Sequence, residues 1–374
     1  MDTVQLLMAL IRIAVCGEAP TETVKRQCTP EMMEKVYTLG AKHDLAHLVG
    51  QGASKLQLED SPVFGKCKKA AMTALVRHTR QAYDYQNICD LLETQKIPFL
   101  PLKGSVLRDF YPEHWLRTSC DMDILVKTED ISCATELLEN AGWKQWEQSS
   151  NEITFTSKDN TVLELHYSLV EDHVTLPVKA ILADIWQHTQ PVNGKQYHME
   201  LPAEWFYCCH LAHMAKHMVY GGCGVRPFLD LWILDKKYPQ LKLPEGSGLE
   251  DFSCVAKKLA QVWFDRVPMD EKSHLLQDYI LAGGAFGSLK NQVDMQRVKK
   301  GGKGNYLLGR IFPPFSEMGG LFPVLQKHPW LTPVFYIVRL FRLLFGGKWK
   351  RSVRELEMLK EETKAEELLT YLGL

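Results

Sequence analysis

Apolar and polar positions along the first 95 residues alternate with the period of an α-helix. The earliest apolar positions of this pattern are Leu6, Leu7, Leu10, Ile11 and Val15. A longer stretch, residues 62–94, mixes apolar and charged residues and contains no glycine or proline after Gly65. An uninterrupted run of this length is typical of one long helix. The pattern therefore predicts a helical N-terminal region that spans residues 1–95.

From residue 96 the apolar runs become short and are bounded by turn residues, which is the pattern of buried strands. The predicted elements are, in order, a strand at 97–102, a short helix that ends at Tyr111, a strand at Asp121–Val126, a helix that ends near Asn140, and two hairpin strands at 151–157 and 161–167. The polar turn at 158–160 tolerates a positive φ and suits a hairpin. We therefore predict a small α/β core with a mixed sheet at residues 96–200.

The remaining residues, 201–374, return to a helical pattern. A helix from Glu204 to Tyr220 is predicted to stop at two glycines, and another is predicted from Arg226 to Lys237. Residues 297–304 are rich in lysine and glycine but lack the order of a phosphate-binding loop, so we interpret them as a mobile surface loop. The predicted fold class is α+β, with a small mixed-sheet core between N-terminal and C-terminal helical regions.

Composition limits the function classes. The 374 residues carry a formal net charge of -1, which argues against a protein that coats nucleic acid, although a local basic groove is compatible with it. None of the ten cysteines forms a C-x-x-C pair, a usage that favours buried thiols in a reduced compartment. The apolar stretch 331–345 is too short to span a bilayer comfortably and contains Arg339 and Arg342. We predict a cytoplasmic protein without a transmembrane segment.

Two carboxylates stand side by side on the second predicted strand. Because alternate side chains of a strand point the same way, Asp121 and Asp123 face one side and Met122 faces the other. Two neighbouring acids repel one another unless a cation lies between them. Carboxylate oxygens favour a hard divalent ion, so the pattern predicts a site for Mg²⁺ or Mn²⁺.

A third acid repeats this arrangement on the later hairpin strand. Glu164 and His166 share one face, and the residues between and beside them are apolar. An acid in the middle of an apolar strand is costly unless it is paired or metal-bound. Three carboxylates from two strands predict a pair of metal ions for phosphoryl or nucleotidyl transfer.

A candidate phosphate site precedes the acids. Gly104 and Ser105 follow the first predicted strand at a turn into a helix, where backbone N–H groups are free to bind an anion. Lys103 lies before this turn and Arg117 lies before the acids, so both cations are predicted to neutralise a bound triphosphate.

The combined motif resembles the DNA-polymerase-β-like nucleotidyltransferase superfamily, whose mark is a Gly-Ser turn, an Asp-x-Asp pair and a later acid. More narrowly, it resembles an uncharacterised bacterial nucleotidyltransferase family over roughly residues 1–240. The matching residues are Pro101-Leu102-Lys103-Gly104, Tyr111-Pro112, Arg117, Asp121-Met122-Asp123-Ile124-Leu125-Val126, Leu163-Glu164-Leu165-His166, His213, His217 and Arg226-x-x-Leu229-Asp230-Leu231. The resemblance implies that Asp121, Asp123 and Glu164 are metal ligands and that Gly104 and Ser105 hold the β- and γ-phosphates.

The resulting functional hypothesis is metal-dependent transfer of a nucleoside monophosphate, most simply AMP, from an NTP to a hydroxyl acceptor. Glu164 would lie nearest the acceptor as the general base. The near-zero net charge favours a small molecule or a protein as acceptor, with RNA as a further possibility.

Two alternatives come from other features of the sequence. His210, His213 and His217 occupy one helical stripe near Asp230, which suggests either a His/Asp metal phosphohydrolase or, preferably, a packed helix face. In the preferred interpretation the acceptor side of the cleft is lined by His166, His213, His217, Arg226 and Asp230. The other alternative is a regulatory or toxin–antitoxin-type module that binds nucleotide without turnover.

Overall fold

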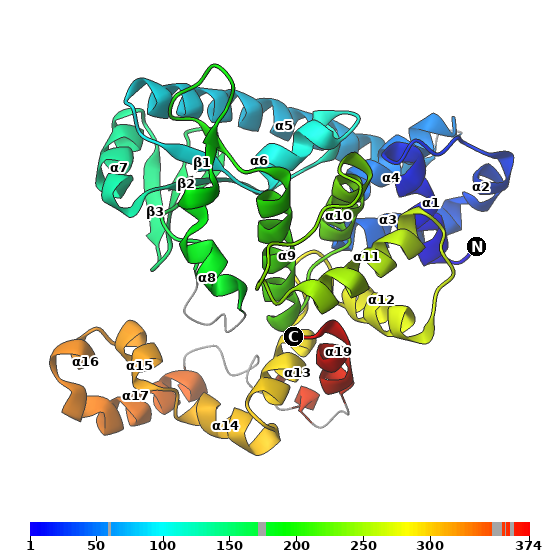
Figure 1. The fold of residues 1–374 in the computed structure, drawn as a ribbon. Helices are drawn as coiled ribbons and strands as arrows, with labels where there is room; N and C mark the ends of the chain where they lie inside the picture. The colour runs from blue at the N-terminus through cyan, green and yellow to red at the C-terminus, as the bar shows by residue number, and fades with distance from the viewer. Residues whose placement is uncertain (59–60, 171–176, 346–353, 356, 360–362) are drawn as a thin grey trace. The chain divides into compact units, whose positions relative to one another are not determined.

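The computed structural model describes the chain except residues 59–60, 171–176, 346–353, 356 and 360–362 (Figure 1). Internal contacts divide the described residues into two compact units. The first unit comprises Met1–Met214 and Val225–His274, and the second comprises Ala215–Gly224 and Leu275–Leu374. Within the described ranges, no helix has both the length and the apolar character needed to cross a membrane.

The first unit begins with five helices, as the apolar period predicts. They are α1 (Thr3–Ala14), α2 (Glu22–Gln27), α3 (Pro30–Lys42), α4 (Ala46–Lys55) and α5 (Pro62–Thr94). The side chains of Asp2, Thr29 and Ser61 accept hydrogen bonds from backbone N–H groups in the first turns of α1, α3 and α5. Helix α1 is buried along nearly its whole length and packs against α3, α4 and α11.

Helix α4 packs unusually close to its neighbours. A Cβ atom on Gly52 would lie 2.4 Å from the carbonyl oxygen of Leu10 in α1, and one on Gly50 would lie 2.6 Å from that of Cys67 in α5. Only glycine permits this backbone approach. The two glycines therefore fix how α4 packs between α1 and α5.

A five-stranded mixed sheet follows, and four of its strands were predicted. Its strands are β1 (Phe99–Pro101), β2 (Asp121–Val126), β3 (Lys144–Gln148), β4 (Glu152–Thr156) and β5 (Val162–His166), in the spatial order β1-β2-β5-β4-β3. All neighbours are antiparallel except β2 and β5, which are parallel. Strand β1 lies at an edge, where Pro101 is tolerated. Although β5 is the last of these five strands in the sequence, it lies at the centre of the sheet.

The exposed strand β3 was not among the predicted elements. Its sequence, Lys144–Gln148, is polar and every residue is exposed, so it lacks the apolar alternation on which the prediction relied. It pairs with β4 through backbone hydrogen bonds and forms the other edge of the sheet.

One face of the sheet packs on α5 and on α7 (Ile131–Asn140). The apolar side chains of β2 and β5 meet Ile88 and Leu92 of α5, and Ala134 and Leu138 of α7. Because alternate residues face opposite sides, this burial leaves Asp123 and Glu164 on the other face. The apolar core therefore determines which face carries the acids.

Short elements connect the sheet strands and follow them. They are α6 (Gly104–Leu107), η1 (Arg108–Phe110), η2 (His114–Leu116), η3 (Thr128–Asp130), α8 (Val178–Ala183), η4 (Ile185–His188), β6 (Gln190–Pro191) and β7 (Met199–Glu200). Three longer helices follow: α9 (Ala203–Val219), α10 (Arg226–Lys237) and α11 (Glu250–Phe264). The predicted helices at 204–220 and 226–237 correspond to α9 and α10.

The second unit is helical. Beyond the end of α9 it contains most of α12 (Glu271–Gly283), then α13 (Leu289–Lys299), α14 (Lys303–Ile311), α15 (Phe315–Leu321), α16 (Val324–Lys327), η5 (Pro329–Leu331), α17 (Thr332–Phe345) and α19 (Ala365–Leu372). The predicted loop at 297–304 is wrong at both ends, since α13 runs to Lys299 and α14 begins at Lys303. Only the positive φ angles of Gly301 and Gly302 interrupt the helices, so lysine content was a poor guide.

Candidate active site

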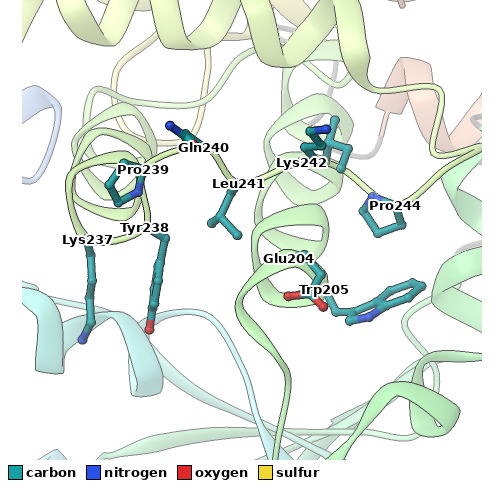
Figure 2. A pocket seen from close by; sticks show the side chains of 10 residues that line it. Glu204, Trp205, Lys237, Tyr238, Pro239, Gln240, Leu241, Lys242 and Pro244 are labelled. Carbon is teal, nitrogen blue, oxygen red and sulfur yellow. The ribbon is translucent and has the colours of Figure 1, made fainter.

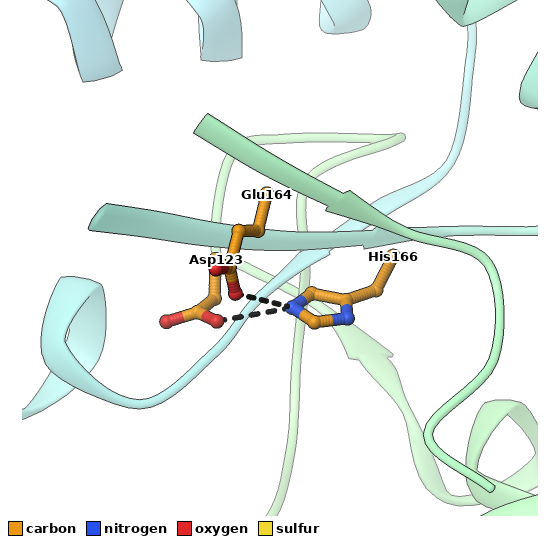
Figure 3. Close-up of side chains that lie close together, drawn as sticks. All are labelled: Asp123, Glu164 and His166. Carbon is orange, nitrogen blue, oxygen red and sulfur yellow. Dashed lines mark hydrogen bonds and ion pairs between the residues drawn. The ribbon is translucent and has the colours of Figure 1, made fainter. Parts of the chain in front are cut away.

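Parallel pairing of β2 and β5 brings together three side chains that the sequence places far apart. Asp123 lies directly opposite Glu164, and His166 follows on the same face of β5. One ligand atom from each of these three residues lies within 4.8 Å of the others (Figure 3). Among the described residues this is the one group of three or more acidic, histidine or cysteine side chains close enough to share a metal ion.

His166 lies between carboxylates on both sides of its ring. Its Nε2 is 3.0 Å from Asp123 Oδ1 and 3.5 Å from Glu164 Oε2, and its Nδ1 is 3.1 Å from Glu152 Oε2. Burial disfavours the charged ring, but hydrogen bonds to Asp123 and Glu164 outweigh burial and raise the pKa of His166 to about 9. The imidazolium is therefore the form that this cluster stabilises at neutral pH.

Lys103 provides a second cation at the same carboxylate. Its Nζ donates to Asp123 Oδ1 at 2.6 Å, while the neighbouring Leu102 N–H donates to the Asp123 carbonyl at 3.0 Å. Lys103 has a φ of 44°, a left-handed conformation that costs energy outside glycine. Burial would raise the pKa of Asp123, but Lys103 and His166 outweigh it and hold that pKa well below its usual range.

The pKa of Asp121 is shifted in the opposite direction to that of Asp123. Burial and the nearby carboxylates of Asp123 and Glu164 raise the pKa of Asp121 to about 6, and Lys103 only partly opposes them. A cation bound beside Asp121 would relieve this repulsion. Charge in the site is therefore uneven. Protein cations neutralise the carboxylate of Asp123, whereas that of Asp121 is repelled by neighbouring carboxylates.

The predicted phosphate turn lies beside two arginines. A Cβ atom on Gly104 would lie 3.3 Å from Arg117 Nη1, so glycine keeps this approach open. The Oγ of Ser105 is buried and has no hydrogen-bond partner among the described residues. A buried hydroxyl without a partner is costly, and a ligand oxygen would satisfy it.

Arg108 was not predicted as a site residue. Its Nε donates to the Gly104 carbonyl at 3.0 Å, and its Nη2 donates to Ser119 Oγ at 3.3 Å. It therefore supports the Gly104–Ser105 turn from behind. Its position one helical turn after Gly104 was the available signal, because residues at i and i+4 lie on the same side of a helix.

A protein-family comparison identifies this arrangement. The family model described as uncharacterised nucleotidyltransferase matches residues 29–246, which include all five sheet strands and all three predicted acids. The chain belongs to this nucleotidyltransferase family. The family predicted from the Gly-Ser turn and the Asp-x-Asp pair is thus confirmed.

Comparison with solved structures finds similarity to the antibiotic-resistance factor ANT(2'')-Ia, described by its solution structure. The match covers 54% of this chain and 91% of the other, with 12% sequence identity and a TM-score of 0.27. No curated protein matches the chain. The TM-score is too low to support an argument, so the family match alone carries the assignment.

In this member of the nucleotidyltransferase family, Arg117 forms an ion pair with Asp230 rather than with the acids on β2. Arg117 Nε donates to both Asp230 oxygens, at 2.9 and 3.1 Å, and Tyr111 donates its hydroxyl to Asp230 Oδ1 at 2.8 Å. Asp230 is fully buried. The Arg117–Asp230 pair thus anchors α10 to the segment before β2, and Arg117 Nη1 still lies near Gly104.

The other predicted acceptor-side residues are placed differently. Arg226 Nη2 donates to the Asp44 carboxylate and to the Asp44 carbonyl, the latter at 3.1 Å. His210 lies 3.0 Å from the Pro227 carbonyl through Nε2, which is a contact between packed helices. His213 belongs to the first unit and His217 to the second. Of the predicted acceptor-side set, His166 is the member that lies in the carboxylate cluster.

A cavity lies in the first unit away from these residues. It has a volume of about 690 Å³ and lies between the start of α9 and the residues that follow α10 (Figure 2). Its lining includes Glu204, Trp205 and Lys237, and none of the predicted site residues. The Lys237 ammonium lies 3.6 Å from the centre of the Phe110 ring, so this cation is already held by an aromatic side chain.

Proposed function

We propose that the chain transfers a nucleoside monophosphate, most simply AMP, from an NTP to a hydroxyl acceptor, with release of pyrophosphate. The observation that carries the proposal is the meeting of Asp123, Glu164 and His166 on adjacent strands, within 4.8 Å, in a chain of the nucleotidyltransferase family. The Gly104–Ser105 turn leads out of the neighbouring strand β1 and supplies a place for phosphates.

The donor set suits a divalent ion. Asp123 and Glu164 offer carboxylate oxygens within reach of one another, and the raised pKa of Asp121 marks a carboxylate that a cation would stabilise. We propose that these three acids hold Mg²⁺ or Mn²⁺. When bound, such an ion supplies Lewis-acid stabilisation of phosphate oxygens and lowers the pKa of an acceptor hydroxyl.

The chain's own residues have distinct roles in this proposal. Ser105 Oγ and the backbone at Gly104 bind the β- and γ-phosphates, which gives the unpartnered hydroxyl an acceptor oxygen. Lys103 lies directly before this turn, so its ammonium can exchange the Asp123 carboxylate for a phosphate. Glu164 accepts the proton of the attacking hydroxyl, and His166 positions Glu164 and Asp123.

The test is transfer of label from α-³²P-labelled nucleotides, each tried singly with Mg²⁺ and with Mn²⁺, to the components of a bacterial lysate. The wild type is compared with an Asp121→Ala/Asp123→Ala variant, and a Glu22→Ala/Glu31→Ala variant on α2 and α3 is the matched control for lost carboxylates. Label that appears with the wild type and the control, but not with the Asp variant, supports nucleotidyl transfer. A blank result with retained nucleotide binding would favour a binding module without turnover.

A further inference from the structure

A groove in the first unit ends one residue before Asp121. Its volume is about 550 Å³, and it lies between the N-terminal half of α5 and the residues that lead into β2 and β5. Cys120 precedes Asp121 in sequence, and Thr161 precedes Val162, the residue paired with Asp121 across the two strands. The groove therefore reaches the starts of β2 and β5, next in the chain to Asp121, the first of the proposed metal ligands.

The α5 wall of this groove is strongly basic. The segment from Pro62 to Tyr83 contains five lysines and arginines and no aspartate or glutamate. Lys69, Arg77 and Arg80 line the groove, spaced so that they share one face of the helix. At 1.5 Å per residue they extend over about 17 Å. A row of three cations over this length suits a ligand with several anionic groups in a line better than a single phosphate.

Two of these cations lack an acidic partner. Within the described part of the chain, Lys69 and Arg80 form no ion pair, and Arg77 lies 3.8 Å from an Asp44 oxygen. Asp159 is the acidic residue in the groove lining. By contrast, Lys66 lies outside the groove and is bonded to Glu34 at 2.8 Å. Two of the three cations that line the groove, Lys69 and Arg80, are therefore available for a ligand.

Exposed apolar side chains alternate with these cations. Met72 and Val76 line the groove with 61% and 45% of their surfaces exposed, and Tyr83, one turn beyond Arg80, is 70% exposed. A duplex presents phosphates but hides its bases, whereas a single strand presents both. Alternating cations and apolar or aromatic side chains match the single strand.

We infer that this groove binds the acceptor of the proposed reaction and that the acceptor is a single-stranded nucleic acid. Its phosphates lie along Lys69, Arg77 and Arg80, and its terminal hydroxyl reaches around the start of β2 to Asp121, on the face of the sheet opposite α5. The near-zero net charge of the whole chain does not oppose this inference, because binding depends on the local distribution of charge. The inference rests on the proposed transferase function, because that function makes the terminal hydroxyl the group that accepts the nucleoside monophosphate.

Binding is tested first, without nucleotide or divalent ion, by fluorescence anisotropy of a 5′-labelled single-stranded RNA of about 12 nucleotides. Three phosphate contacts predict that affinity falls about 20-fold as salt rises from about 50 to about 200 mM. The Lys69→Gln/Arg77→Gln/Arg80→Gln variant should lose most of this dependence, and Lys69→Gln/Arg80→Gln tests the groove without disturbing Asp44. The matched control removes three cations elsewhere, as Lys25→Gln/Arg26→Gln/Lys35→Gln on α2 and α3.

Equal binding by the groove variants and the control, or equal binding of a blunt duplex of the same sequence, would overturn the inference. Asp121→Ala/Asp123→Ala should lose transfer but keep the salt dependence of RNA binding, which separates this test from that of transfer. Finally, the labelled product from the lysate experiment should be destroyed by a nuclease specific for single strands. A labelled product that resists the nuclease contradicts the inference and leaves the transferase proposal intact.

Discussion

Lys103 and His166 place two cations beside the same carboxylate oxygen of Asp123, Oδ1, and these cations stabilise the site without a metal ion. The side chain of Asp123 is only 5% exposed, so it depends on these partners for solvation. A divalent ion that binds Asp123 must therefore compete with the Lys103 ammonium. The same lysine stabilises the empty site and weakens its attraction for a metal.

We predict that Lys103→Met binds Mn²⁺ at least about tenfold more tightly than the wild type, because removing a positive charge next to the ligands lowers electrostatic competition. The metal-free variant should be less stable by about 1–3 kcal/mol, since the Asp123 carboxylate loses a hydrogen-bonded partner that is itself 30% exposed. Calorimetric titration and urea denaturation measure the two effects. Lys127→Met, at the end of β2, is the control and should change neither.

His47 should make the stability of the first unit dependent on pH. It is buried, its Nε2 lies 2.9 Å from the Leu116 carbonyl, and burial lowers its pKa from 6.5 to about 4. Since the unfolded chain takes up this proton first, stability is greatest above about pH 6.5 and falls as the pH drops towards about 4. The loss is at most about 3 kcal/mol.

Urea denaturation at several pH values would check this, with His47→Gln as the variant without a titrating ring. The difference in unfolding free energy between wild type and variant should shrink as the pH falls through this window. A constant difference would show that His47 does not carry the effect.

At this scale the local pattern selects the three acids as candidates but does not reveal the residues that contact them. Alternation along a strand is a local property, so Asp121, Asp123 and Glu164 could be selected from the sequence. The Arg117–Asp230 pair joins residues 113 positions apart and depends on packing of α10, which no local pattern reveals. The contact of Glu152 with His166 was accessible in principle, because a hairpin centred on Asp159 pairs these two residues.

At the scale of elements, the contact of α4 with α1 and α5 should be the most sensitive helix contact in the first unit. We predict that Gly52→Ala lowers the free energy of unfolding by about 1–3 kcal/mol, because its new methyl group would meet the Leu10 carbonyl. Gly65→Ala in α5 is the matched control. Nothing lies within 4 Å of its Cβ, so alanine there should stabilise the helix by about 0.5–1 kcal/mol.

Chemical denaturation of the two variants decides this prediction. Equal effects of Gly52→Ala and Gly65→Ala would mean that α4 can move away from α1 at little cost. The close approach of these helices could not be foreseen from periodicity, which fixes the buried face of a helix but not its distance from a neighbour.

The sheet shows a similar division between local and long-range information. The hairpin of β4 and β5 follows from its turn and its alternating residues, and it was predicted with near-correct limits. The parallel pairing of β2 with β5 is long-range and was not predicted, although an acid on each strand between apolar neighbours indicated that the two strands share metal ions. Strand β3 shows that backbone pairing alone can extend a sheet.

At the scale of the whole molecule, metal binding should be visible as stabilisation. A ligand that binds only the folded chain adds about 2.7 kcal/mol at a concentration 100 times its dissociation constant. We predict that Mn²⁺ raises the thermal midpoint of the first unit by several degrees and that Asp121→Ala/Asp123→Ala abolishes the shift. Differential scanning calorimetry is the measurement, because it can separate the transitions of two units.

An equal shift in the variant would place the ion elsewhere and contradict the assignment of these acids. The prediction of three regions, 1–95, 96–200 and 201–374, stays a prediction about folding units. Internal contacts group most residues before 275 into one unit, but contact density does not measure which parts fold on their own.

The central position of β5 also has a consequence for synthesis of the chain on the ribosome. Strand β2 emerges with one edge paired to β1, and its other edge has no partner until β5 emerges. From Asp123 to Glu164 the ribosome adds 41 residues, which takes about 2–8 s. During that interval an apolar strand edge is open to pairing with other nascent chains. Slow codons between these positions would lengthen the exposure, so translation speed over 124–164 should influence the yield of folded protein.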